Sequence, residues 1–128
     1  MECRHRKIPI EFTRGDSYTL TCTYESINPA PPPVYLPIAL GPTVAIYMTC
    51  KRYKNDADAA ALFELLLGAG ITITDAPNGK FTIVIPKAAT GSPPCEVPYF
   101  YDVVIELNGA RQTVMSGTLT LRENITDA

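Results

Sequence analysis

Residues that commonly carry catalysis are few in this chain of 128 residues. His5 is the only histidine, and it lies in a basic cluster at residues 4–7 with no serine or cysteine placed to form a nucleophile–base pair. The neighbouring carboxylates Asp56 and Asp58 fit the start of a helix, where negative charge is favourable. The sequence has no phosphate-loop, zinc-protease, calcium-loop or nucleophile-elbow motif. We therefore expect no enzymatic activity and no cofactor.

The four cysteines, Cys3, Cys22, Cys50 and Cys95, do not have the spacing of a metal site. No two of them form the CxxC or CxxxC pair that is typical of structural zinc. Cys22 and Cys50 are in phase with the apolar residues of strand-like segments, so we expect buried thiols. The alternative is a Cys22–Cys50 disulfide, which a reducing compartment disfavours.

Charge and hydropathy argue against two classes of partner. The formal net charge is −2, and the basic cluster at residues 4–7 is short and lies near one end, so we expect no nucleic-acid contact. No apolar run approaches the roughly 20 residues that span a bilayer, so we expect no membrane contact. The first residues lack the apolar segment of a signal peptide, which predicts a protein that is made in a cytoplasm.

Alternation of apolar and polar residues dominates the chain and predicts β-strands. The predicted strands span residues 7–13, 17–24, 43–53, 71–75, 80–86, 99–107 and 111–121. Asn78-Gly79 and Asn108-Gly109 are hairpin signals, because both residue types tolerate positive φ. Arg14-Gly15-Asp16 matches the integrin-binding tripeptide, but its place between two predicted strands favours a simple turn.

One stretch, residues 57–67, has the pattern of a short helix. Asn55 and Asp56 precede it as capping residues, and Gly68 follows it as a stop signal. Its alanines and leucines give a broad apolar face, which predicts a helix that covers one end of the β-structure.

Strands that alternate with turns favour an antiparallel architecture over a parallel one. The sequence therefore predicts an all-β fold, an antiparallel β-sandwich of about seven strands with one short helix. We expect a single domain over residues 1–128, with its core in residues 7–121 and a tail at residues 122–128.

A proline-rich stretch, residues 25–42, interrupts the strand pattern. Pro31, Pro32 and Pro33 favour polyproline II and exclude a central strand or a helix. A connection of this length is either a stiff crossover between two sheets or a docking loop for a partner.

With these segments in place, the chain resembles the small Ig-like structural proteins of tailed bacteriophages, including the N-terminal domains of upper baseplate proteins. The resemblance rests on the order of loose motifs across about residues 12–126. These motifs are GDSYTL at residues 15–20, PIALGPTV at 37–44, ITD with a glycine at 73–79, YFYDV at 99–103, the final strand at 113–121, and IT at 125–126. The proline-rich insertion and Cys95 depart from the pattern.

The resemblance implies an Ig-like sandwich and a non-enzymatic virion protein. Such a protein would act in the tail, the baseplate or fibre attachment, or as a capsid decoration protein. Its partners would be other virion proteins, and we expect a homo-oligomer or many copies in an assembly. The alternative is a soluble Ig-like binding or adhesion module outside a virion.

The hypothesis for the partner surface combines the proline-rich loop with the two ends of the chain. Stiff segments lose little conformational entropy on docking, and apolar residues beside them supply anchors. The predicted contact residues are Pro31, Pro32, Pro33, Val34, Tyr35, Leu36 and, in the tail, Ile125.

Overall fold

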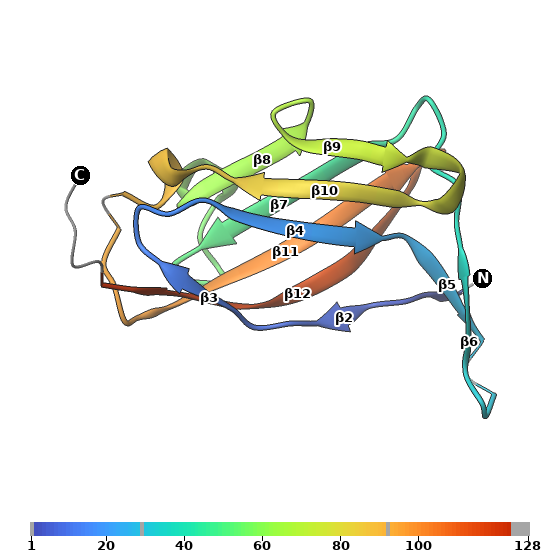
Figure 1. The fold of residues 1–128 in the computed structure, drawn as a ribbon, viewed down its shortest axis with the longest axis horizontal. Coiled ribbons are helices and arrows are strands. Elements are labelled where there is room, and N and C mark those ends of the chain that lie inside the picture. Colours follow the sequence, from blue (N-terminus) through green and yellow to red (C-terminus); the bar gives the residue numbers. More distant parts are fainter. Residues whose placement is uncertain (1, 29, 92, 124–128) are drawn as a thin grey trace.

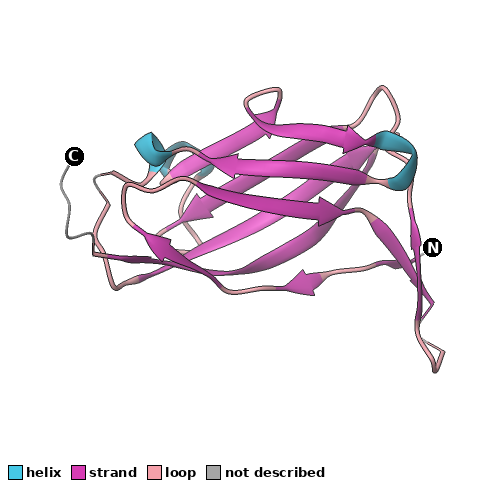
Figure 2. Ribbon diagram, viewed as in Figure 1, coloured by secondary structure: helices cyan, strands magenta, loops and turns pink. Residues whose placement is uncertain are grey.

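The computed structural model describes residues 2–28, 30–91 and 93–123, which form twelve strands and three short 3₁₀ helices (Figures 1 and 2). The strands are β1 (Glu2–Cys3), β2 (Arg6–Lys7), β3 (Ile10–Thr13), β4 (Tyr18–Thr23), β5 (Glu25–Asn28), β6 (Val34–Pro37), β7 (Ala45–Lys51), β8 (Phe63–Leu67), β9 (Gly70–Asp75), β10 (Lys80–Ile85), β11 (Pro98–Leu107) and β12 (Ala110–Arg122). The 3₁₀ helices are η1 (Asp58–Ala60), η2 (Ala76–Asn78) and η3 (Lys87–Ala89). The prediction of an all-β protein is confirmed.

Nine strands form one curled sheet in the order β2-β12-β11-β7-β8-β9-β10-β4, with β3 also paired to β12. Most neighbours are antiparallel, but β12 pairs in parallel with β2 and β3, and β8 with β9. The sheet is therefore mixed, and the expectation of purely antiparallel pairing is wrong. The physical reason is that β2 and β3 run in the same direction as the last strand, β12, and fill its outer edge.

The core lies inside the curl, where β4 and β10 pass over β7 and β11 (Figure 1). One cluster of buried side chains draws on both halves of the sheet; its fully buried members include Ile46, Met48, Phe81, Ile83, Ile105 and Leu119. At the β3–β4 corner, the rings of Phe12 and Tyr18 stack with centroids 4.9 Å apart. Aromatic stacking of this kind adds to the stabilisation from buried area.

Both predicted Asn-Gly turns occur where the sequence places them. Asn108 and Gly109 have φ of 52° and 82° and join β11 to β12. Gly79 ends η2 with φ of 68° and leads into β10, which pairs with β9. Positive φ explains the glycine at both turns and the asparagine at position 108, whereas Asn78 is the last residue of η2.

The predicted helix at residues 57–67 is wrong. This stretch contains only the one-turn η1 and then β8, which pairs with β7 from Phe63 to Leu66. Phe63 and Leu65 are buried whereas Glu64 and Leu66 are exposed, which is the alternation of a strand. A short apolar run satisfies either period, and pairing with the edge of β7 decides between them.

The predicted irregular connection at residues 25–42 is also wrong in part. Residues 25–28 and 34–37 form the β5–β6 hairpin, and β5 pairs on its other side with β1. We call this three-stranded sheet, β1-β5-β6, the arm. It projects from one end of the curled sheet (Figure 1).

Candidate contact surface

The two faces of the arm follow from its register. Residues that face each other in a ladder point to the same side of a sheet. Ile27 lies opposite Tyr35, so these side chains share one face; Ser26 and Leu36 share the other. Asn28 pairs with Val34 on that second face. Val34 and Leu36 therefore lie on the same face of the arm, next to the small polar residues Asn28 and Ser26.

Strand β6 is exposed along its whole length. Val34, Tyr35 and Leu36 are 48%, 40% and 60% exposed. The described part of the chain has six large exposed apolar residues, and these are three of them. Three consecutive apolar residues left open on both faces of an edge strand are a typical partner surface.

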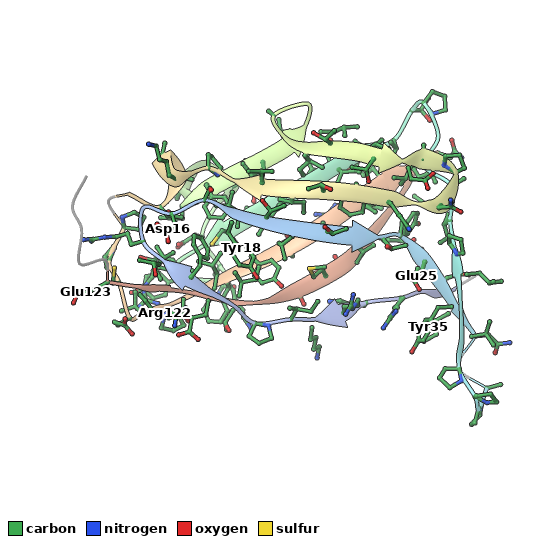
Figure 3. All side chains as sticks on the ribbon, viewed as in Figure 1. Asp16, Tyr18, Glu25, Tyr35, Arg122 and Glu123 are labelled. Atoms are coloured by element: carbon green, nitrogen blue, oxygen red, sulfur yellow. The ribbon has the colours of Figure 1, made fainter. Side chains whose placement is uncertain are left out.

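Arg4 contacts two side chains on the Tyr35 face of the arm. Its guanidinium lies 3.9 Å from the centroid of the Tyr35 ring and 3.4 Å from the Glu25 carboxylate. Figure 3 shows Glu25 and Tyr35 side by side on the arm. A cation held between a ring and a carboxylate orders the Tyr35 side chain. This face is held by contacts within the molecule, whereas among the described residues no ring contact or ion pair involves Val34 or Leu36.

The root of the arm is anchored on the β9–β10 turn. The Tyr24 amide donates to the Gly79 carbonyl and the Ile38 amide to the Tyr24 carbonyl, each at 2.8 Å. A Cβ at Gly79 would lie 2.5 Å from the Ile38 oxygen and 2.6 Å from the Tyr24 oxygen. Only glycine allows this approach, so the turn fixes where the arm leaves the sheet.

The predicted contact residues are brought together only in part. Pro31, Pro32 and Pro33 are exposed at the tip of the arm, next to Val34, Tyr35 and Leu36. Ile125 lies outside the described residues. The last described residues, Arg122 and Glu123, lie at the end of the molecule opposite Tyr35 (Figure 3). The arm and the start of the tail are therefore separate surfaces.

A second feature, which sequence reasoning missed, is a hollow of about 770 Å³ on the outer face of β7, β11 and β12. Its lining mixes charged, hydroxyl and aromatic side chains, among them Thr49, Lys51, Phe100, Asp102 and Arg111. The signal was the polar half of the alternation in these strands, which predicts an outer face but not its curvature.

Asp102 is half-buried in the hollow, and burial raises the pKa of its carboxyl, although Arg111 and Lys51 act in the opposite sense. Near the rim, Lys51 Nζ lies 2.7 Å from the Asp58 carboxylate, and this hydrogen bond lowers the pKa of Asp58. Asp102 therefore lies on the outer face of the sheet in surroundings that are partly desolvated.

The cysteines differ in burial. Cys22 and Cys50 are free thiols in the core, as predicted, and Cys95 is a half-buried free thiol. Over the described ranges, no group of three histidine, cysteine, aspartate or glutamate residues is arranged to hold a metal ion.

Arg14-Gly15-Asp16 forms the turn between β3 and β4. The Asp16 amide donates to the Thr13 carbonyl at 3.1 Å, and Gly15 has φ of 84°. The Gly15 amide donates to the hydroxyl of the buried Thr90 at 3.2 Å. The tripeptide is thus part of a tight, anchored turn, and its role as a turn is confirmed.

Comparison with known proteins gives no match to a family model and no match to a curated protein sequence. Among the helices of the described residues, none is long and apolar enough to cross a membrane.

Proposed function

We propose that this protein is a non-enzymatic structural protein of a bacteriophage virion, which works by contact through its arm. The observation that carries the proposal is the uncovered strand β6, with Val34, Tyr35 and Leu36 exposed. A monomer gains nothing from three exposed apolar residues on an edge strand, whereas an assembly protein buries them against a neighbour.

The strand order supports an Ig-like sandwich for the body of the molecule. The run β12-β11-β7-β8 has the order G-F-C-C′ of one Ig sheet, and β4-β10-β9 has the order B-E-D of the other. The β8–β9 pairing joins the two halves into one sheet. This order agrees with the resemblance of the sequence to phage Ig-like proteins.

The proposed place in the virion comes from the resemblance of the sequence to phage Ig-like proteins. The protein would act in the tail, the baseplate or fibre attachment, or as a capsid decoration protein. Its partners would be other virion proteins, in many copies, assembled in the host cytoplasm. No cofactor is part of the proposal.

The test is to fractionate a lysate that contains assembled particles on a density gradient and to quantify this chain by mass spectrometry. The proposal predicts that the chain sediments with the particles in a fixed ratio to their other proteins. Recovery only in the soluble fractions would overturn it.

A second candidate is a soluble Ig-like binding or adhesion module outside a virion. The hollow beside Asp102 favours it, because concave surfaces with a few convergent polar groups are the usual sites for small ligands. The same gradient separates the two candidates, since an adhesion module would be found free or on cells.

A further inference from the structure

The direction of the backbone groups on β6 sets what its open edge can bind. In an antiparallel ladder, successive residues direct their N–H and C=O groups alternately toward and away from the neighbouring strand. The Ile38 amide donates to the Tyr24 carbonyl, which continues the β5–β6 register and fixes this phase. The amides of Leu36 and Val34 therefore face β5, and those of odd-numbered residues face outward.

Only one outward position on β6 carries an amide donor. Residues 33, 35 and 37 direct their backbone groups away from β5, but Pro33 and Pro37 have no N–H. Tyr35 is left with an outward donor and an outward acceptor. A partner strand must therefore centre its hydrogen bonds on Tyr35, and it finds no donor on either side.

A second copy of the same strand satisfies this requirement. If two β6 strands run antiparallel about a two-fold axis at Tyr35, each Tyr35 amide donates to the Tyr35 carbonyl of the other copy. Pro33 of one copy then lies opposite Pro37 of the other; neither residue has an N–H, so no hydrogen bond forms at this position and the ladder is limited to the Tyr35 pair. The interface is isologous, which is the commonest arrangement in soluble oligomers.

The same register pairs every exposed apolar side chain of β6 with another. Val34 of each copy lies opposite Leu36 of the other, on the face that carries Ser26 and Asn28. These are non-hydrogen-bonded positions, at which side chains approach most closely. The two Tyr35 rings meet on the opposite face, each beside its own Arg4. Cross-strand aromatic and aliphatic pairs of this kind stabilise a sheet.

We infer that the protein dimerises through β6, with Tyr35 opposite Tyr35 and Val34 opposite Leu36, so that two arms form one six-stranded sheet. This inference rests on the proposed function, because it names the partner of the same arm surface. Pro33 and Pro37 end the hydrogen-bonded ladder on either side of Tyr35. The contact therefore joins two copies of β6, and hydrogen bonding does not continue along the edge.

The first experiment measures register by cross-linking. Residues in a hydrogen-bonded antiparallel pair have Cα atoms about 5.5 Å apart, within the range that a disulfide spans. Tyr35→Cys should therefore give a disulfide-linked dimer under mild oxidation. Val84→Cys is the matched control, because Val84 is 40% exposed on β10, and it should give little dimer. Equal yields from both variants would contradict the register.

The second experiment uses charge complementation in sedimentation equilibrium. The pair Val34→Lys with Leu36→Lys, and the pair Val34→Glu with Leu36→Glu, should each weaken dimerisation by about tenfold or more. Mixing the two double variants should restore a heterodimer, since lysine then faces glutamate at both positions. Val84→Lys should dimerise like the wild type. Unchanged thermal unfolding would show that the variants fold.

The outcomes separate this inference from the proposed function. A wild-type protein that stays monomeric up to about 1 mM would overturn the dimer, since pairing weaker than this has no role. If incorporation into particles nevertheless depends on Val34 and Leu36, the arm binds a different virion protein, and the proposed function stands.

Discussion

Cys22 and Cys50 show how burial controls chemistry at single residues. Desolvation raises the pKa of the Cys22 thiol to about 11 and that of the Cys50 thiol to about 12. A buried thiol with a high pKa holds little of the thiolate that reacts with alkylating reagents. The two residues therefore act as small apolar side chains of the core.

The burial of these two thiols predicts that they react more slowly in the folded protein than in the unfolded chain. In native protein at pH 8, Cys22 and Cys50 should resist iodoacetamide, and both should be modified after unfolding in urea. Peptide mass spectrometry gives the extent of modification at each site. Rapid modification of either residue in the folded protein, or an internal bridge that leaves both unmodified after unfolding, would contradict the structure.

Asp102 predicts a pH dependence of stability. Burial raises the pKa of its carboxyl in the folded state, so the folded protein binds this proton more tightly than the unfolded chain. Ionisation of Asp102 therefore costs stability as the pH rises from the ordinary aspartate pKa of about 4 through the raised value.

The variant Asp102→Asn removes this cost. Its free energy of unfolding should exceed that of the wild type at pH 7, and the difference should shrink as the pH falls below about 4. Urea unfolding at a series of pH values measures it. A variant that is less stable than the wild type at pH 7 would show that Arg111 and Lys51 outweigh the burial of the carboxylate.

At the scale of elements, Gly79 links the body to the arm. It has positive φ, and the carbonyl oxygens of Tyr24 and Ile38 crowd the position of a Cβ. Gly109 has a similar positive φ, but no atom lies within 4 Å of its Cβ position. A comparison of the two glycines therefore distinguishes the cost of positive φ alone from the added cost of a Cβ that lies too close to other atoms.

We predict that Gly109→Ala costs about 1 kcal/mol, the price of a left-handed alanine. Gly79→Ala should cost about 3 kcal/mol, because the backbone at the root of the arm must also move. Chemical denaturation of both variants gives the difference. Equal costs would mean that the arm does not depend on this contact.

The comparison of β8 with the Asn-Gly hairpins shows what local sequence can predict. Asn108-Gly109 has a turn geometry that few other residues adopt, so it predicted the β11–β12 hairpin directly. Residues 63–67 are an apolar run that suits a helix or a strand, and only pairing with β7 decides. Pairing partners distant in sequence are not visible in a local pattern.

The same limit applies to the candidate contact surface. The proline run beside Val34, Tyr35 and Leu36 predicted a surface segment, and the structure shows that these three residues are exposed; their role as anchors stays a prediction. Their place on a hairpin could not be predicted, because the sequence between β5 and β6 has the composition of an irregular loop. The hollow beside Asp102 depends on the curl of the whole sheet, which the polar half of the strand alternation does not predict.

On the scale of the whole molecule, the body and the arm have different roles. The body buries one continuous core and has no buried side-chain nitrogen or oxygen without a hydrogen-bond partner in the described residues. The arm is a small sheet with β6 uncovered, a size that is marginal on its own. In the proposed function, the body supports the arm and the arm makes the contact with a neighbour.

If the exposed face of β6 is the contact surface, incorporation into particles must depend on its apolar side chains. The double variant Val34→Ser with Leu36→Ser removes the two anchors and should change stability by no more than about 0.5 kcal/mol. Val84→Ser with Leu66→Ser is the matched control, because these residues are 40% and 41% exposed on the body.

The amount of each variant in gradient-purified particles is measured against wild type by mass spectrometry. We predict that the arm variant folds but is depleted at least about tenfold, a loss of about 1.4 kcal/mol in contact energy, while the control incorporates normally. Normal incorporation of the folded arm variant would contradict the account.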